Sequence, residues 1–264
     1  MPGFGLGVYK VQEGDEVERA VYSALELGYR SIDTAALYGN EVGVGRAIRK
    51  SGVARREIFI TTKVWNSDQG YEATRDAFSR SRERLGVDYV DLYLIHWPVP
   101  VKYLETWRAL EDLYRDGAVR AIGVSNFQIH HLQDIARASR VVPTVNQVEC
   151  HPFLSQVPLR QYCREHGVHL EAWSPLMRGG DILQNPVIQE IALAHGKTPA
   201  QVVLRWDLEH EVITIPKSVT AERIRENSDL FDFALSTEEV GRIDALNRDE
   251  RIGPDPDTFD MVPR

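Results

Sequence analysis

The chain has 264 residues, of which 43% are hydrophobic and 27% are charged, so it is long enough to bury a large globular core. Its formal net charge of -8 argues against a nucleic acid or an anionic membrane as the main partner, because both repel an acidic protein. The sequence has neither a secretory leader nor a run approaching the roughly 18 apolar residues of a membrane span, and its only cysteines are Cys150 and Cys163. We therefore expect a soluble cytoplasmic protein with two free thiols.

Short apolar segments alternate with amphipathic segments along the whole chain. The clearest helix covers residues 17–25, where the apolar side chains recur at the spacing of one helical face. Two later helices are expected to begin after Thr198 and Ser236, because Gln201 and Glu239 stand three residues further on, as in a capping box. Runs rich in β-branched residues predict eight strands, at residues 5–8, 30–32, 58–62, 91–95, 119–124, 141–145, 169–172 and 212–215.

Eight strands, each followed by a helical segment, predict a single α/β domain over residues 1–264, folded as a (β/α)8 TIM barrel. An open doubly wound sheet is the alternative. In a barrel the carboxyl ends of all strands open on one face, so residues that follow different strands converge on one site. The residues after these strands are nearly all polar or aromatic: Tyr9, Asp33, Lys63, His96, Ser125 with Asn126, Gln147, Trp173 with Ser174, and Lys217 with Ser218.

Four of the side chains at this face form a plausible acid-base group: Asp33, Lys63, His96 and Tyr38, the last one short loop beyond Asp33. The ordinary pKa of a phenol is about 10, so Tyr38 needs help to exchange protons near neutrality. A nearby Lys63 cation is expected to favour the phenolate, and Asp33 to hold that lysine charged. Taken singly, these residues are better explained as a structural ion pair and a core histidine, but their joint placement after different strands favours catalysis.

A series of motifs resembles those of the aldo-keto reductases, small bacterial members included, over essentially the whole chain. They lie at residues 5–7, 28–35 with Tyr38, 62–65, 91–98, 123–127, 146–149, 173–176 and 215–218. The resemblance implies that Asp33, Tyr38, Lys63 and His96 are a catalytic tetrad. In that family a hydride passes from nicotinamide C4 to a carbonyl carbon while the tyrosine protonates the oxygen, which the histidine orients.

The resemblance also implies an NADPH site. Hydrogen bonds to the carboxamide and stacking on the nicotinamide are assigned at one end, where Trp173 replaces a more usual tyrosine. Cations at the other end suit the 2′-phosphate, which favours NADPH over NADH. The residues expected at the cofactor are Val8, Asp33, Ser125, Asn126, Gln147, Trp173, Ser174, Leu176, Lys217, Ser218, Arg223, Glu226 and Asn227. Those expected at the substrate are Tyr9, Trp65, His96 and Trp97.

Other readings of the sequence are weaker. Residues 39–45 lack the third glycine of a dinucleotide loop and do not follow a strand, so they are better explained as the start of a helix. Cys163, His166 and His169 lack a fourth ligand, and we expect no metal. Glu149 lacks the second carboxyl group that a glycosidase needs at a strand end. A nicotinamide-binding regulatory barrel with little turnover stays open as the alternative function.

The sequence departs from the family pattern at its ends. The first strand begins almost at Met1, so the hairpin that usually covers the barrel floor is expected to be missing, which would expose apolar surface there. The segment from Trp97 to a helix near Tyr103 is short, and so is the tail after Asn247, which predicts an open pocket. Small aldehydes, α-dicarbonyls such as methylglyoxal and keto-sugars are the implied substrates of a monomeric enzyme. Residues 261–264 match nothing in the family pattern.

Overall fold

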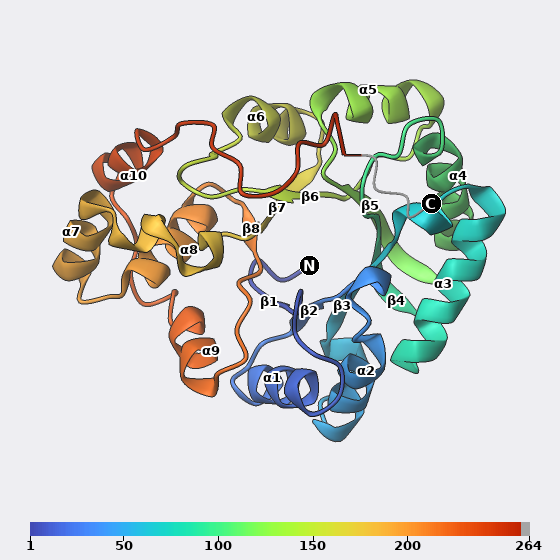
Figure 1. Cartoon of the computed structure of the whole chain (residues 1–264), viewed down its shortest axis with the longest axis horizontal. Coiled ribbons are helices and arrows are strands. Elements are labelled where there is room, and N and C mark those ends of the chain that lie inside the picture. Colours follow the sequence, from blue (N-terminus) through green and yellow to red (C-terminus); the bar gives the residue numbers. More distant parts are fainter. Residues whose placement is uncertain (260–264) are drawn as a thin grey trace.

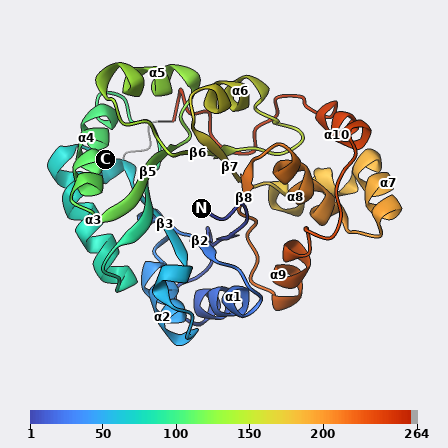
Figure 2. The same ribbon diagram turned by 180° about the vertical axis from the view of Figure 1, so that it is seen from behind.

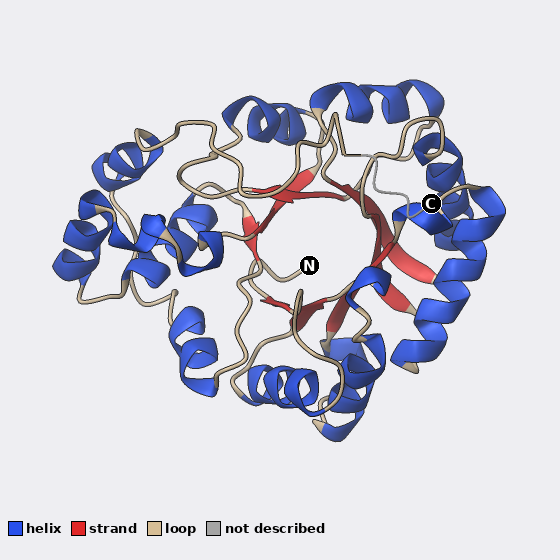
Figure 3. Cartoon of the chain, in the orientation of Figure 1, coloured by secondary structure: helices blue, strands red, loops and turns tan. Residues whose placement is uncertain are grey.

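The computed structural model describes residues 1–259, which form the predicted barrel (Figure 1). Eight parallel strands follow one another around it in chain order, and Figure 3 shows them as the inner ring. Backbone hydrogen bonds close the ring, from Gly5 N to Thr214 O at 3.1 Å and from Gly7 N to Pro216 O at 3.2 Å. The strands are β1 (Leu6–Gly7), β2 (Ser31–Asp33), β3 (Phe59–Val64), β4 (Val90–Ile95), β5 (Val119–Ser125), β6 (Val145–Glu149), β7 (His169–Trp173) and β8 (Ile213–Thr214).

Ten helices in the described part of the chain surround the strands, as the two opposite views show (Figures 1 and 2). None of them is long and apolar enough to cross a membrane. The two predicted capping boxes are present, at Thr198 with Gln201 and at Ser236 with Glu239. The helices are α1 (Asp15–Glu26), α2 (Glu41–Lys50), α3 (Tyr71–Leu85), α4 (Tyr103–Arg115), α5 (Ile129–Ala138), α6 (Val157–Glu165), α7 (Pro186–His195), α8 (Pro199–Glu209), α9 (Ala221–Ser228) and α10 (Thr237–Asp244).

One strand was placed wrongly by the sequence prediction. Residues 141–144 form a loop, and β6 begins only at Val145 and continues to Glu149. Pro143 has no N–H to give to a strand neighbour, and the Val141 N–H donates to Ser139 Oγ at 2.9 Å instead. Because β6 runs four residues further than predicted, Gln147 lies within the strand rather than after it.

The floor of the barrel is better covered than expected. No strand precedes β1 in the described residues, yet the N-terminal segment lies beside β8, and the N-terminus lies near the barrel axis in both views (Figures 1 and 2). Phe4 is 8% exposed and packs its ring on that of Tyr29, with centroids 4.8 Å apart. The exposed apolar surface at this end is therefore small, with Met1 and Val142 about half exposed.

The glycines of residues 39–45 serve helix packing. Gly43 and Gly45 lie in α2, where a Cβ on the first would overlap Val17 of α1 and a Cβ on the second would overlap the carbonyl oxygen of Leu85 in α3. Glycine here allows three helices to approach closely, which accounts for the segment without a phosphate-binding role.

We predict that Gly45→Ala lowers the free energy of unfolding by roughly 1–3 kcal/mol, because the added methyl group meets rigid backbone. Gly241→Ala is the matched control, since Gly241 lies in α10 with nothing near its missing Cβ, and it should raise stability by about 0.5–1 kcal/mol. Urea unfolding of both variants checks this. Equal effects of the two substitutions would contradict the packing role.

Candidate active site

A buried ion pair lies at the centre of the site. Lys63 of β3 is fully buried, and its Nζ donates to Asp33 Oδ1 at 2.7 Å, to Asp33 Oδ2 at 2.9 Å and to the Thr34 carbonyl at 3.0 Å. Burial is the largest single influence on this lysine and lowers its pKa, but the charge of Asp33, the hydrogen bond to Asp33 and the neighbouring Tyr38 and Glu171 together raise the net pKa. Lys63 is therefore charged inside the barrel.

Tyr38 lies beside this pair. A single 3₁₀ turn, Ala36–Tyr38, follows β2 and brings the phenol oxygen to 3.3 Å from Lys63 Nζ. The pKa of Tyr38 is raised to about 12, mainly by burial, because the lowering by the Lys63 charge only partly offsets burial and the smaller rise due to Asp33. Lys63 thus favours the phenolate in the expected direction, but burial outweighs it and the phenol is neutral near pH 7. A neutral phenol is, however, the form that can donate a proton.

His96 completes the predicted group. It follows β4 and is buried, with its ring 5.7 Å from that of Tyr38 and 5.0 Å from that of Trp65 between centroids. Burial, and then the Lys63 charge, lower the pKa of His96 well below its ordinary value, so the imidazole is neutral. Its Nδ1 is buried without a partner in the described chain, so the proton is better placed on Nε2. The structure thus gathers all four members of the predicted tetrad.

Glu171 is a buried acid that sequence reasoning missed. Gln147 of β6 donates through Nε2 to Asp33 Oδ2 at 2.8 Å and to Glu171 Oε2 at 2.7 Å. Burial, and then the charge of Asp33, raise the pKa of Glu171 to about 8. The sequence did contain an indication of this residue. Side chains alternate between the two faces of a strand, and Glu171 stands two residues before Trp173 in β7, so it lies on the same face.

The residues expected at the nicotinamide form one connected network. Trp173 Nε1 donates to Asn126 Oδ1 at 2.8 Å, and Asn126 Nδ2 donates to the His96 carbonyl at 3.0 Å and to Ser125 Oγ at 3.1 Å. Ser125 Oγ in turn donates to the Gln147 carbonyl at 2.8 Å. The indole N–H thus gives Trp173 a fixed partner, which accounts for tryptophan at this position.

The residues expected at the phosphate end lie together after β8. Ser218 and Asn227 are buried there, and Glu226 accepts a hydrogen bond from the Thr198 hydroxyl at 2.8 Å. Lys217 and Arg223 are exposed, and neither forms an ion pair within residues 1–259. Two unneutralised cations beside a helix suit an anionic ligand.

The remaining predicted residues are placed as follows. Val8 is buried directly after β1, Leu176 is half-buried, and Ser174 has a left-handed backbone with φ of 51°. Tyr9 is 47% exposed, with its ring 5.0 Å from that of Tyr38, and Trp97 is buried.

The C-terminal segment covers part of the site, which corrects the prediction of an open pocket. In Figure 1 this segment, in red, passes α6, β7 and β6 toward α5. Buried Glu149 accepts from the N–H groups of Ile252 at 2.7 Å and Gly253 at 3.0 Å. Gly253 lies so close to Trp173 that a Cβ would overlap the indole, and the Phe259 ring packs on Trp97 at 4.3 Å. Residues 261–264, singled out in the sequence, lie outside the described residues.

Two cavities elsewhere do not contribute to this site. One of about 270 Å³ lies between α6, β7 and the end of α8, and one of about 250 Å³ lies between α5, α6 and Arg251. Neither is lined by a member of the tetrad. Cys150 and Cys163 are free, as predicted, and both are buried.

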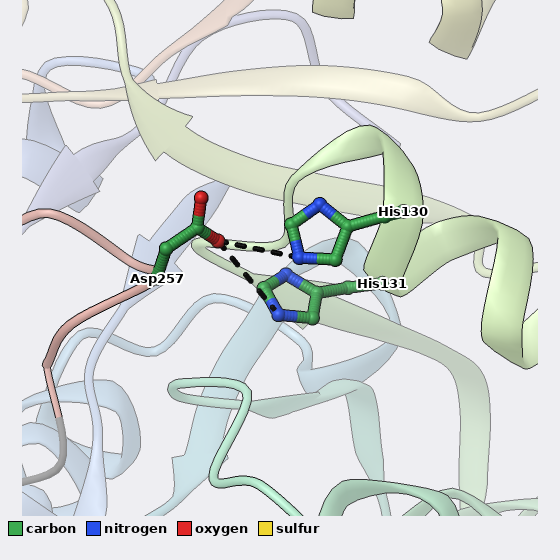
Figure 4. A group of neighbouring side chains, drawn as sticks. All are labelled: His130, His131 and Asp257. Atoms are coloured by element: carbon green, nitrogen blue, oxygen red, sulfur yellow. Dashed lines mark ion pairs between the residues drawn. The ribbon is translucent and has the colours of Figure 1, made fainter.

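One group of side chains resembles a metal site, and its hydrogen bonding argues against that role. Figure 4 shows His130 and His131 directed at Asp257, with Nε2 to Oδ1 distances of 3.3 and 3.9 Å. However, His131 Nδ1 accepts the Gln128 N–H at 3.1 Å, and its pKa is lowered to about 4 by burial and then by His130. The neutral ring therefore carries its proton on Nε2, which cannot then bind a metal. That the protein needs no metal stays a prediction.

The chain is similar to known proteins over nearly its full length. A model of the Aldo/keto reductase family matches residues 3–248. Glyoxal reductase of Bacillus subtilis (strain 168) is 61% identical, over 97% of this chain and 93% of its own. Methylglyoxal reductase DkgA of Escherichia coli (strain K12) is 48% identical, over 98% of this chain and 94% of its own.

Solved structures are also similar to this chain over nearly its full length. The aldo-keto reductase MGS-M4, from a Medee basin deep-sea metagenome library, superposes with a TM-score of 0.96 at 47% identity, over 98% of this chain and 96% of its own. A variant of Gox0644 in complex with NADPH superposes with a TM-score of 0.93 at 46% identity, over 98% of this chain and 94% of its own.

The Glu149 carboxylate accepts from the N–H groups of Ile252 and Gly253 and also lies 3.0 Å from His151 Nε2. We predict that Glu149→Gln loosens the C-terminal segment, because an amide has one acceptor oxygen in place of two and turns its own N–H groups toward these donors. Trypsin should then cut after Arg251 several-fold faster than in the unmodified protein. Glu250→Gln is the control, since Glu250 lies on the same segment but is exposed. Equal cleavage rates in the two variants would show that Glu149 does not hold the C-terminal segment in place.

Proposed function

Because the chain belongs to the aldo/keto reductase family, we propose that it reduces small aldehydes, α-dicarbonyls of the methylglyoxal type or keto-sugars to alcohols, with Tyr38 as proton donor. It is an NADP-dependent oxidoreductase that acts on carbonyl groups, and NADPH is its cofactor. The observation that carries the proposal is the Tyr38 hydroxyl, 3.3 Å from an ammonium that Asp33 keeps charged. We also infer a cytoplasmic monomer of one domain.

The residues around the tetrad fit the cofactor. When bound, NADPH supplies a hydride from nicotinamide C4. Gln147 Oε1 forms no hydrogen bond in the described chain and is available to a carboxamide, with Ser125 and Asn126 beside it. Trp173 offers an aromatic face, held at Nε1 by Asn126 and at its ring edge by Gly253. At the other end, Lys217 and Arg223 supply cations for the 2′-phosphate.

The chain's own residues handle the proton. Tyr38 is neutral at physiological pH and gives its hydroxyl proton to the carbonyl oxygen as that oxygen gains negative charge. The phenolate that remains lies against the Lys63 ammonium, which stabilises it, and Asp33 prevents the lysine from losing its own proton instead. His96, neutral with its proton on Nε2, donates a hydrogen bond to the same carbonyl oxygen and orients it.

The walls around these groups suit a small carbonyl compound. Tyr9 packs on Tyr38 and Trp65 packs on His96, with ring centroids 5.0 Å apart in each pair. Trp97 follows His96 in the chain, and its ring packs on that of Phe259. Aromatic walls bind apolar and weakly polar groups without demanding a charge. The names of two relatives, glyoxal reductase and methylglyoxal reductase, point to the same class of substrate.

The direct test mixes the protein with NADPH and methylglyoxal and follows the loss of nicotinamide absorbance, and then extends to a panel of aldehydes and keto-sugars. Turnover with α-dicarbonyls supports the proposal. NADPH binding with no oxidation across the whole panel would favour a regulatory barrel instead.

Tyr38→Phe should lower turnover by roughly 100-fold to 10,000-fold, the range expected for positioned proton transfer, while NADPH still binds. Steady-state kinetics and fluorescence titration with NADPH measure the two effects. Tyr114→Phe, which removes an exposed hydroxyl from α4, is the control and should behave as the unmodified enzyme does. Near-normal turnover of Tyr38→Phe would remove Tyr38 from the mechanism.

Arg223→Ala should raise the Michaelis constant for NADPH by roughly 10-fold or more, the worth of a charge-assisted hydrogen bond, and leave that for NADH nearly unchanged. Arg225→Ala is the control, because Arg225 is exposed on the same helix but two residues away, where it points to a different side. An equal loss with both cofactors would contradict the phosphate role of Arg223.

A further inference from the structure

Gln147 is held by two carboxyl groups at once. Its Nε2 lies 2.8 Å from Asp33 Oδ2, which belongs to the tetrad, and 2.7 Å from Glu171 Oε2, which does not. Glu171 is fully buried in β7, paired with Gln147 in the register of β6 and β7. Nothing in the proton transfer described above uses Glu171. A buried carboxyl group that contacts a cofactor-facing side chain calls for an explanation of its own.

The two contacts fix the orientation of the Gln147 amide. A primary amide has two N–H donors and one acceptor oxygen, and turning it over exchanges them. Asp33 Oδ2 accepts from Lys63 Nζ as well, so the Gln147 atom that faces it must be the nitrogen, and the second N–H of that nitrogen is directed at Glu171 Oε2. With Asp33 alone, the second N–H would lack an acceptor and the plane of the amide could turn about the one hydrogen bond to Asp33. The acceptor from Glu171 removes that freedom and directs Oε1 away from the acids.

We propose that Glu171 is a positioning residue for the cofactor: it holds the Gln147 amide with Oε1 presented as an acceptor for the carboxamide NH₂ of the nicotinamide. This inference rests on the proposed function, in which Gln147 binds the carboxamide. It assigns to Glu171 a role in recognising one end of NADPH without touching it.

The protonation state of Glu171 agrees with this role. The charged groups that face it are Asp33 and Lys63, and its pKa is raised to about 8, by burial first and then by Asp33. At neutral pH Glu171 is therefore largely a neutral acid, which still accepts the Gln147 N–H but adds no second negative charge beside Lys63. Glutamine, a neutral group of the same shape with one acceptor oxygen, should replace it, whereas methionine should not.

Binding measurements with three ligands test this on the whole enzyme by tryptophan fluorescence. NADP⁺ carries the carboxamide, its 3-acetylpyridine analogue has a methyl group in place of the NH₂, and 2′-phospho-ADP-ribose lacks the ring altogether. Glu171→Met should weaken NADP⁺ binding roughly fivefold to tenfold, the worth of one hydrogen bond, and leave the other two ligands unchanged. Glu171→Gln should keep the preference of the unmodified enzyme for NADP⁺ over the analogue.

Each other outcome has a definite meaning. If Glu171→Met weakens all three ligands alike, Glu171 acts only on the structure and the proposal is overturned. The proposal also fails if Glu171→Met keeps the full preference for NADP⁺ over the analogue. Should Glu171→Met not fold, shown by loss of the circular dichroism of the unmodified enzyme, Glu171→Ala is measured in the same way. An unmodified enzyme that does not discriminate NADP⁺ from the analogue would contradict the carboxamide role of Gln147 instead.

Discussion

The site depends on one buried ion pair, Lys63 with Asp33. Two opposite charges in the barrel interior are costly to desolvate, and they are stable there only when their geometry is good and their remaining donors and acceptors are satisfied. The structure meets that condition: the ammonium has both carboxylate oxygens and the Thr34 carbonyl within 3.0 Å, and the carboxylate also accepts from Gln147. The neighbouring strands β2 and β3 supply both partners, so the barrel itself sets their separation.

Around this pair the other titratable groups are kept neutral. Burial raises the pKa of Tyr38 and of Glu171 and lowers that of His96, so a phenol, a carboxylic acid and an imidazole are all uncharged near pH 7. In the mechanism proposed above, one negative charge forms during the reaction, on the Tyr38 oxygen, and the Lys63 ammonium lies 3.3 Å from that oxygen. Low polarity elsewhere in the site strengthens that single interaction.

The barrel and the placement of the tetrad could be predicted from the sequence, because both depend on the order of strands and helices along the chain. Strands alternating with helices predict the ring, and the position of Asp33, Lys63 and His96 at strand ends predicts their convergence. The role of Glu149 could not be predicted, because its partners Ile252 and Gly253 lie more than 100 residues away along the chain. The raised pKa of Tyr38 could not be predicted either, because its main cause is burial, which is a property of the folded chain.

The most direct test of the central claim is a double-mutant cycle on the ion pair, read as the free energy of unfolding of Asp33→Leu, Lys63→Met and the double variant. If each charge is tolerated only because of the other, each single variant leaves a buried charge without its partner and loses roughly 3–5 kcal/mol. The double variant should then be clearly more stable than the sum of the two losses implies, though inactive. A loss in the double variant equal to that sum would contradict this account, because it would show that the two residues stabilise the barrel independently.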